Sequence, residues 1–264
     1  MSDGDYLLGT RDDEVERLGL QHRVWRDQML RGFATAGFGP GQTILDVGSG
    51  PGFATQDLSA IVGPAGKVIA FERSPHFLSV LRARKLSNVE VCAADILDQS
   101  LGDGIADGAW TRWVLAFVAD PAKAVASIAR ALKPNGIAVF HEYLDYEAWR
   151  LLPVNNVHER YRHLVIKSWR DSGGEPNAAQ SLPLQLTAAG LELVAIRPMV
   201  EIISAGDAMW QWPTSFMVTS AWRLHALGYC SAEEAAEFAA LPDTFAPDAH
   251  LLTPVVAEII ARKR

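Results

Sequence analysis

The glycine-rich run that follows segment 44–47 is the strongest candidate for a ligand-binding site in this sequence. Gly48, Gly50 and Gly52 stand at alternate positions directly after an apolar stretch that predicts a buried strand. Glycine has no Cβ, so a turn built from it bends sharply and lets a ligand lie against its backbone. Because open α/β sheets bind ligands where their strands end, this junction predicts a site for a nucleotide-like cofactor.

The residues after the glycines narrow the choice of cofactor. A phosphate-binding P-loop requires a lysine after its last glycine, whereas Phe53, Ala54 and Thr55 follow Gly52, so ATP or GTP is disfavoured. The dinucleotide fingerprint requires a small residue at position 53, where helix and strand pack closely. Phe53 therefore counts against NAD, although an NAD-dependent oxidoreductase stays an alternative.

Three acidic residues follow three predicted strands. Asp46 ends the first strand, Glu72 follows segment 67–71, and Asp95 follows segment 89–93. The carboxyl ends of parallel strands meet at one edge of a sheet, so these carboxylates are expected to gather there. An acid about 20 residues past the glycines in such a unit binds ribose hydroxyls. A carboxylate beside the turn would repel a pyrophosphate and suits a cationic ligand.

The sequence resembles the class I S-adenosylmethionine-dependent methyltransferases, in the small-molecule branch that includes the ubiquinone and menaquinone biosynthesis enzymes. The resemblance lies in LDVGSGPG at 45–52, FE at 71–72, AD at 94–95 and ALKPNG at 131–136. It covers roughly positions 40–145. Asn135 replaces a glycine in the last motif, and Asn also tolerates the left-handed conformation.

This resemblance implies S-adenosylmethionine as the cofactor and assigns roles to individual residues. Glu72 would bind both ribose hydroxyls, Asp95 would accept the adenine amino group, and Ile96 would lie against the ring. Arg112 and Trp113 follow the fourth strand. At this position the backbone of family members contacts the methionine amine, and the side chains face the substrate. The implied cofactor-binding residues of the core are Asp46, Gly48, Ser49, Gly50, Gly52, Glu72, Arg73, Asp95, Ile96, Arg112 and Trp113.

The N-terminal segment 1–36 is expected to fold over the cofactor, as in related small-molecule methyltransferases. It contains a predicted helix over 12–36. Tyr6, Arg17 and Gln21 would close the site around the methionine carboxylate, and Arg17 offers the bidentate donor that a carboxylate favours. The alternative interpretation is a solvated helix face with ordinary charges.

The acceptor side is expected at the end of a fifth strand over 137–140. His141 has the pKa range of a general base, and Glu142 or Tyr143 would orient the acceptor. Alternatively, His141 is a hydrogen-bonded spacer, since a carbanion, phenolate or free amine accepts a methyl group without a protein base. The substrate-binding candidates are Trp113, His141, Glu142, Tyr143, Trp169 and Trp210.

Aromatic residues are concentrated in the last part of the chain. Five of the eight tryptophans follow position 145. Segments 145–181 and 205–250 predict a helical cap over an apolar or aromatic acceptor, although most of these rings could serve only to pack the cap. The predicted function is transfer of a methyl group to an O, N or C nucleophile of a small metabolite. A non-catalytic S-adenosylmethionine-binding protein is the other alternative.

The order of these elements predicts one α/β domain over 1–264, with its cofactor-binding core at 37–144. We expect a Rossmann-like open sheet of about seven strands with helices on both faces. The resemblance implies that the last strand, 255–261, is antiparallel and lies between the fifth strand and a sixth at 191–196. Segment 247–252 is expected to be the connecting loop.

Composition limits the partners and the compartment. With 24 Lys and Arg against 31 Asp and Glu, the net charge is −7, which disfavours nucleic acid because binding to phosphates needs a basic surface. Two distant cysteines favour a reducing cytoplasm over a disulfide framework. The sequence predicts no signal peptide, no membrane span and no metal site. It does not predict the oligomeric state.

Overall fold

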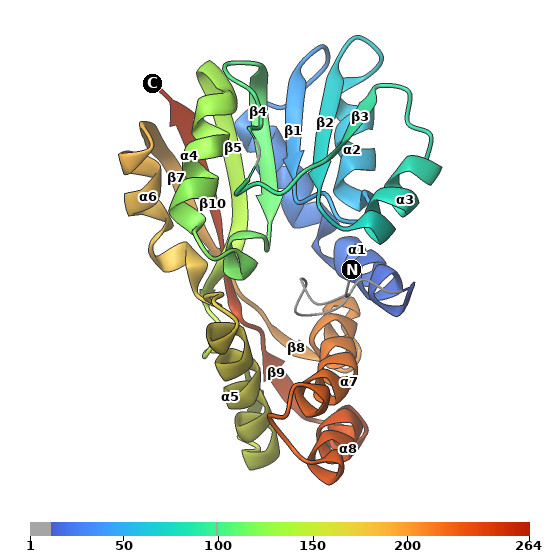
Figure 1. Ribbon diagram of the computed structural model, residues 1–264. Helices are drawn as coiled ribbons and strands as arrows, with labels where there is room; N and C mark the ends of the chain where they lie inside the picture. The colour runs from blue at the N-terminus through green and yellow to red at the C-terminus, as the bar shows by residue number, and fades with distance from the viewer. Residues whose placement is uncertain (1–11, 99) are drawn as a thin grey trace.

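The main sheet and a helical cap beyond one end of it make up the computed structural model, which describes residues 12–98 and 100–264 (Figure 1). The sheet has seven strands in the order β3-β2-β1-β4-β5-β10-β7. Its strands are β1 (Thr43–Val47), β2 (Lys67–Glu72), β3 (Val89–Ala93), β4 (Ala106–Arg112), β5 (Leu132–Asp145), β7 (Leu191–Met199) and β10 (Val255–Lys263). The predicted Rossmann-like sheet is thereby confirmed.

Strand β10 is antiparallel to both of its neighbours. Ile259 of β10 pairs with Phe140 of β5 on one side and with Ile196 of β7 on the other. Strands β1 to β5 pair in parallel, so the carboxyl ends of β1, β2, β3 and β4 meet at one edge. The predicted placement of the last strand between the fifth and sixth is correct.

Helices cover the two faces of this sheet and build two apolar cores. On one face, α1 and α2 pack through Phe33 and Leu58, and the ring of Phe33 meets that of Trp110 edge-on at 4.9 Å. On the other face, Ile128 and Leu186 of α4 and α6 pack against the strands. The helices around the sheet are α1 (Asp12–Ala36), α2 (Phe53–Val62), α3 (Pro75–Ala83), α4 (Pro121–Ala131) and α6 (Leu182–Ala188).

Local sequence signals fix several helix starts and one turn. Ser74 and Asp120 accept hydrogen bonds from the first turns of α3 and α4. Ser231 and Glu234 form a reciprocal capping box at the start of α8 (Ala232–Ala240), as the Ser-x-x-Glu spacing predicts. Asn135 has φ +66°, the left-handed conformation expected where the family has glycine.

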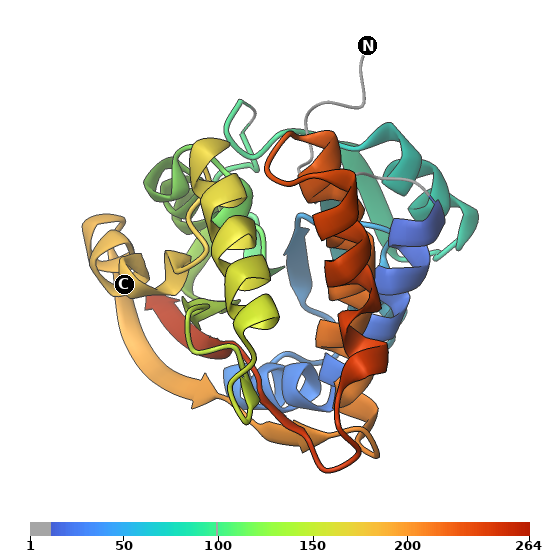
Figure 2. The same ribbon diagram turned by 90° about the horizontal axis from the view of Figure 1, so that it is seen from below.

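The cap consists of three helices and a small second sheet, and seen from below α5 and α7 flank the ends of the main strands (Figure 2). Its helices are α5 (Asn156–Asp171), α7 (Gln211–Ala226) and α8, and its strands, in the order β6-β9-β8, are β6 (Arg150–Leu152), β9 (His250–Leu252) and β8 (Ile202–Ser204). Short 3-10 helices are η1 (Leu115–Phe117), η2 (Ala178–Gln180), η3 (Ala208–Trp210) and η4 (Leu241–Thr244).

Two expectations about the cap are corrected. The cap segment expected to be helical from 145 becomes helical only at Asn156, because β5 continues to Asp145 and β6 follows it. The loop expected over 247–252 contains β9, which pairs with both β6 and β8. Strands of three residues are too short for their periodicity to be read. Across the described residues, no helix is both long and apolar enough to span a bilayer.

His158 of α5 is a buried histidine from which we expect an acid-sensitive stability. The side chain is fully buried, and neither ring nitrogen has a hydrogen-bond partner within the described residues. The ring stands edge-on to Trp149 at 4.9 Å. Burial lowers the pKa of His158 to about 3 from an ordinary value of 6.5. Below pH 6.5 the unfolded chain therefore binds a proton that the folded chain excludes, and the folded state loses stability as the pH falls.

We expect His158→Phe to remove this acid sensitivity. Between about pH 7.5 and pH 5, the unfolding free energy of the native protein should fall by about 2 kcal/mol relative to that of the variant. Other buried groups titrate in both proteins, so their contributions cancel in the difference. Urea unfolding of both proteins at the two pH values measures the effect, and identical pH dependence would contradict it.

Candidate active site

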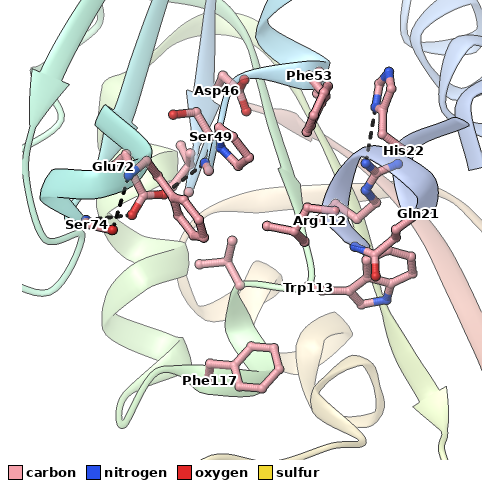
Figure 3. Close-up of a pocket in the computed structure, with 18 of the residues that line it drawn as sticks. Gln21, His22, Asp46, Ser49, Phe53, Glu72, Ser74, Arg112, Trp113 and Phe117 are labelled. Carbon is pink, nitrogen blue, oxygen red and sulfur yellow. Dashed lines mark hydrogen bonds between the residues drawn. The ribbon is translucent and has the colours of Figure 1, made fainter. Parts of the chain in front are cut away.

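A cavity of about 760 Å³ lies between the carboxyl ends of the strands and the cap (Figure 3). Its walls come from the glycine turn after β1, the ends of β2 and β4, helix α1 and the aromatic residues of the cap. Cavities of roughly 300–1,000 Å³ hold small molecules and cofactors. The cavity thus lies at the sheet edge where ligands of open α/β sheets bind.

The three glycines of the turn serve two different purposes. Gly48, Gly50 and Gly52 have φ values of +71°, +55° and +83°. A Cβ on Gly48 would lie 2.3 Å from Val114, and one on Gly52 would lie 2.3 Å from Leu81, whereas one on Gly50 would meet nothing within 4 Å. Gly48 and Gly52 are therefore required by packing inside the protein. Gly50 leaves open space on the cavity wall.

Phe53 shows why the dinucleotide fingerprint is broken at this position. Its ring lies 5.7 Å from that of His22 in a stacked arrangement, and the guanidinium of Arg84 lies 4.4 Å above it. A Cβ on Gly19 of α1 would come within 3.0 Å of the ring. Phe53 thus packs α1 against the start of α2, a contact that a small residue could not make.

Glu72 is held rigidly at the end of β2 (Figure 3). Its Oε2 accepts a hydrogen bond of 2.8 Å from the backbone N–H of Gly50. Its Oε1 accepts hydrogen bonds of 2.8 Å from the N–H groups of Arg73 and Ser74. These bonds fix the carboxylate on the cavity wall and tie it to the glycine turn.

Asp95, Ile96 and Arg73, which the sequence predicts to bind the cofactor, also line the cavity. Asp95 accepts a hydrogen bond of 2.9 Å from the N–H of Leu97 and one of 3.2 Å from Nη1 of Arg73. Ile96 is buried and lines the same wall. The predicted strand-end residues are therefore gathered around one cavity.

Asp46 and Arg112 are titratable groups on the cavity wall, and Asp46 is buried whereas Arg112 is half-buried. Burial raises the pKa of Asp46 to about 7, although the Thr55 hydroxyl, which donates a hydrogen bond of 2.6 Å, opposes the rise. Burial lowers the pKa of Arg112 to about 10 while the charge of Asp46 opposes this. Arg112 therefore stays cationic at neutral pH. Its Nη1 is buried and has no hydrogen-bond partner among the described residues.

The residues predicted on the N-terminal segment have other partners in this structure. Tyr6 lies outside the described residues. Arg17 donates hydrogen bonds of 2.7 Å to both carboxylate oxygens of Glu14 and one of 3.1 Å to Gln21. The Gln21 side-chain oxygen also accepts a hydrogen bond of 3.2 Å from the indole N–H of Trp212. Arg17 and Gln21 thus line the cavity and join α1 to the cap.

Aromatic rings form the half of the cavity beneath the cap. Trp113 stacks on Trp212 at 5.6 Å and on Tyr143 at 5.4 Å, and Trp169 lines the same space. Five aromatic residues that were not among the substrate-binding candidates also line it, namely Phe117, Tyr146, Trp149, Trp212 and Phe216. The four-residue spacing of Trp212 and Phe216, which places them on one face of α7, could have identified this pair.

His141 does not line the cavity, contrary to the expectation that it faces the acceptor. It is fully buried, and its Nε2 lies 3.0 Å from Oε2 of Glu258 on the paired strand β10. Burial lowers its pKa to about 4 despite this contact. The expected strand end was misplaced, because β5 continues past His141 to Asp145. This placement favours the hydrogen-bonded spacer over the catalytic base.

Glu142 and Trp210 also lie outside the cavity lining. Glu142 accepts hydrogen bonds of 2.9 Å from the N–H groups of Val114 and Leu115, so it shapes the segment after β4. Burial raises its pKa to about 7. Trp210 packs edge-on against Phe245 at 5.7 Å. Contrary to the prediction that these two residues bind the substrate, neither lines this cavity.

Comparisons with known proteins find methyltransferases among the proteins that this chain resembles. Residues 45–140 match the model of the methyltransferase domain family. Over 105 residues the chain is 42% identical to an uncharacterised protein encoded by a transposon of Streptomyces fradiae, covering 39% of this chain and 30% of that protein. Over 155 residues it is 31% identical to the ubiquinone/menaquinone biosynthesis C-methyltransferase of Vibrio campbellii, covering 56% and 58%. The chain thus spans less than two thirds of these relatives.

The fold is shared with solved structures over most of the chain. A solved protein structure from Bacillus halodurans C-125 superposes with a TM-score of 0.62 at 16% identity, covering 90% of this chain and 99% of that one. At this identity the likeness shows the fold alone. Residues 45–140 therefore match a methyltransferase domain, within a fold that this chain shares with solved structures.

Proposed function

We propose that this chain transfers the methyl group of S-adenosylmethionine to an O, N or C nucleophile of a small, planar, apolar or aromatic metabolite. The observation that carries the proposal is one continuous cavity with two chemically different ends. Fixed carboxylates and an open glycine turn line the end at the sheet. Aromatic rings line the end beneath the cap.

The sheet end fits the cofactor residue by residue. Glu72 would bind the ribose hydroxyls, since its carboxylate is already held on the cavity wall by three backbone N–H groups. Asp95 would accept the adenine amino group, with Ile96 against the ring. The open space over Gly50 would admit the part of the cofactor that lies on the turn.

The cap end supports the choice of acceptor. Aromatic side chains stack on flat rings and bury large apolar areas with little loss of conformational freedom. Trp113, Tyr143 and Trp169 line the cavity with such surfaces, and Trp212 lines it from the cap. This lining favours a planar acceptor over a highly charged one.

The bound cofactor supplies an electrophilic methyl group on a sulfonium, and the protein's task is alignment. The aromatic walls would hold the nucleophile in line with that methyl group, and the cap would exclude water. Since His141 lies off the cavity, catalysis would depend on proximity and on an acceptor that is itself nucleophilic. An NAD-dependent reaction is disfavoured because Phe53 fills the position at which a dinucleotide fold needs a small residue.

Methyl transfer can be tested directly. The purified protein is incubated with methyl-labelled S-adenosylmethionine and a panel of quinols, phenols and aromatic amines, together with nucleic acid and protein substrates. We expect labelled product from an aromatic member of the panel. Tight binding of the cofactor without turnover of any acceptor would favour a non-catalytic binding protein, and transfer only to macromolecules would overturn the proposed acceptor class.

A cap tryptophan tests where the acceptor binds. We expect Trp169→Leu to raise the KM for the acceptor about 10-fold, because it removes an aromatic wall worth about 1 kcal/mol or more, while the affinity for the cofactor stays unchanged. Trp222→Leu is the matched control, since Trp222 is another cap tryptophan but is 49% exposed outside the cavity lining. Equal effects of the two variants would contradict this location for the acceptor.

A further inference from the structure

Arg112 differs from the other arginines of the cavity wall in its hydrogen-bond partners. Arg17 donates to the carboxylate of Glu14. Arg73 donates to the carboxylate of Asp95. Within residues 12–98 and 100–264, Arg112 has no hydrogen bond to a carboxylate, and its Nη1 is buried without a partner. A buried guanidinium nitrogen without an acceptor is costly, so this atom is suited to an acceptor supplied by a ligand.

A buried histidine, His22 of α1, contacts this guanidinium (Figure 3). Nδ1 of His22 lies 3.4 Å from Nη2 of Arg112, and Nε2 of His22 lies 3.0 Å from Oδ2 of Asp57. Arginine only donates, so Nδ1 must accept and the ring proton must be on Nε2, where it is donated to Asp57. Arg26 binds the same carboxylate, with Nη2 2.7 Å from Oδ1. A chain of hydrogen bonds thus runs from α2 through α1 to Arg112.

The surroundings of Arg112 restrict the ligand group that it would bind. The guanidinium lies 5.7 Å from the ring of Trp110 and 5.2 Å from that of Trp113, so aromatic faces and His22 limit its orientation. A planar guanidinium held in this way presents paired N–H donors in one plane, the arrangement that a carboxylate accepts. Of the groups of the cofactor, the carboxylate of its methionine part has this chemistry.

We propose that Arg112 binds the methionine carboxylate of the cofactor, and that His22 and Asp57 are positioning residues that hold its guanidinium in place. This inference rests on the proposed function, because it assumes that the cofactor lies in this cavity. The residue proposed to bind the methionine carboxylate is therefore Arg112 at the end of β4. The sequence suggested Arg17 of α1 for this role, but the guanidinium of Arg17 is paired with Glu14.

Two ligands that differ in the amino acid part test the inference by binding alone. S-adenosylhomocysteine carries the carboxylate, whereas methylthioadenosine keeps the adenosine and lacks the amino acid. Calorimetric titration of both ligands is carried out on the native protein and on four variants, Arg112→Met, Arg17→Met, His22→Phe and His22→Gln. Binding of methylthioadenosine also shows that each variant keeps a folded cofactor site.

We expect Arg112→Met to weaken S-adenosylhomocysteine about 20-fold, as loss of a charge-assisted hydrogen bond does, and to leave methylthioadenosine within about 2-fold of the native protein. His22→Phe should weaken S-adenosylhomocysteine about 5-fold and spare methylthioadenosine. His22→Gln keeps a donor and an acceptor, so it should restore most of the affinity.

Other outcomes separate the two proposals. If Arg112→Met weakens both ligands equally or neither of them, or if only Arg17→Met discriminates between them, the assignment of the carboxylate to Arg112 is wrong while the cofactor site stands. If His22→Phe has no selective effect, the positioning role of His22 is wrong. If the native protein binds neither ligand, the proposed function fails and this inference fails with it.

Discussion

Replacing Glu72 with alanine is expected to weaken binding of S-adenosylhomocysteine about 100-fold or more. The carboxylate would accept hydrogen bonds from two ribose hydroxyls, and each bond to a charged group contributes about 1.5–3 kcal/mol. Alanine also removes the acceptor from the N–H groups of Gly50, Arg73 and Ser74, which fix the turn. Calorimetric titration measures the loss. Glu72→Gln keeps one acceptor oxygen, so its affinity for the ligand should lie between those of the native protein and Glu72→Ala.

The control for this prediction is Glu90→Ala. Glu90 lies on the neighbouring strand β3, is about half exposed, pairs with Lys67 and is outside the cavity lining. Its replacement removes the same charge from the protein without touching the site, so binding should stay unchanged. Native-like affinity in Glu72→Ala would show that the ribose lies elsewhere, and the assignment of the cofactor end would then fail.

The cofactor end could be predicted from the sequence because its geometry is local. Asp46 and Glu72 lie at the carboxyl ends of β1 and β2, and Asp95 lies two residues after β3. Because these strands pair in parallel, the position of each acid along the chain also gives its position at the sheet edge. The glycine spacing could be read for the same reason, since turn and strand are adjacent. The sequence did not show that, of the three turn glycines, Gly50 is the one that borders open space. The side chains that crowd Gly48 and Gly52 come from segments farther along the chain.

The acceptor end could not be predicted in the same detail because it depends on distant contacts. The expected strand end placed His141 at the cavity, but pairing with β10, more than 100 residues later, carries β5 on to Asp145. The small cap sheet joins three segments that are far apart in the sequence. The contact of His22 with Arg112 likewise joins α1 to β4. No periodicity within one segment reports such contacts.

Replacing Gly50 with valine is expected to have the largest effect of any single change, a loss of about 1,000-fold in affinity for S-adenosylhomocysteine, or about 4 kcal/mol. Nothing in the protein lies within 4 Å of a Cβ at this position, so the added carbons would project into the space proposed for the cofactor. The fold should tolerate them apart from local strain. Calorimetric titration, with thermal unfolding beside it, measures both consequences.

A matched variant at Gly104 separates the backbone strain of a valine at Gly50 from its steric effect on ligand binding. Gly50 has φ +55° and Gly104 has φ +59°. Both values lie in the left-handed region, where a branched side chain is strained. A Cβ on Gly104 also meets nothing within 4 Å, but Gly104 lies outside the cavity lining. Gly104→Val should therefore lower the unfolding temperature about as much as Gly50→Val while leaving the affinity unchanged. If the two variants bind the ligand equally, the open space over Gly50 is not where the cofactor lies.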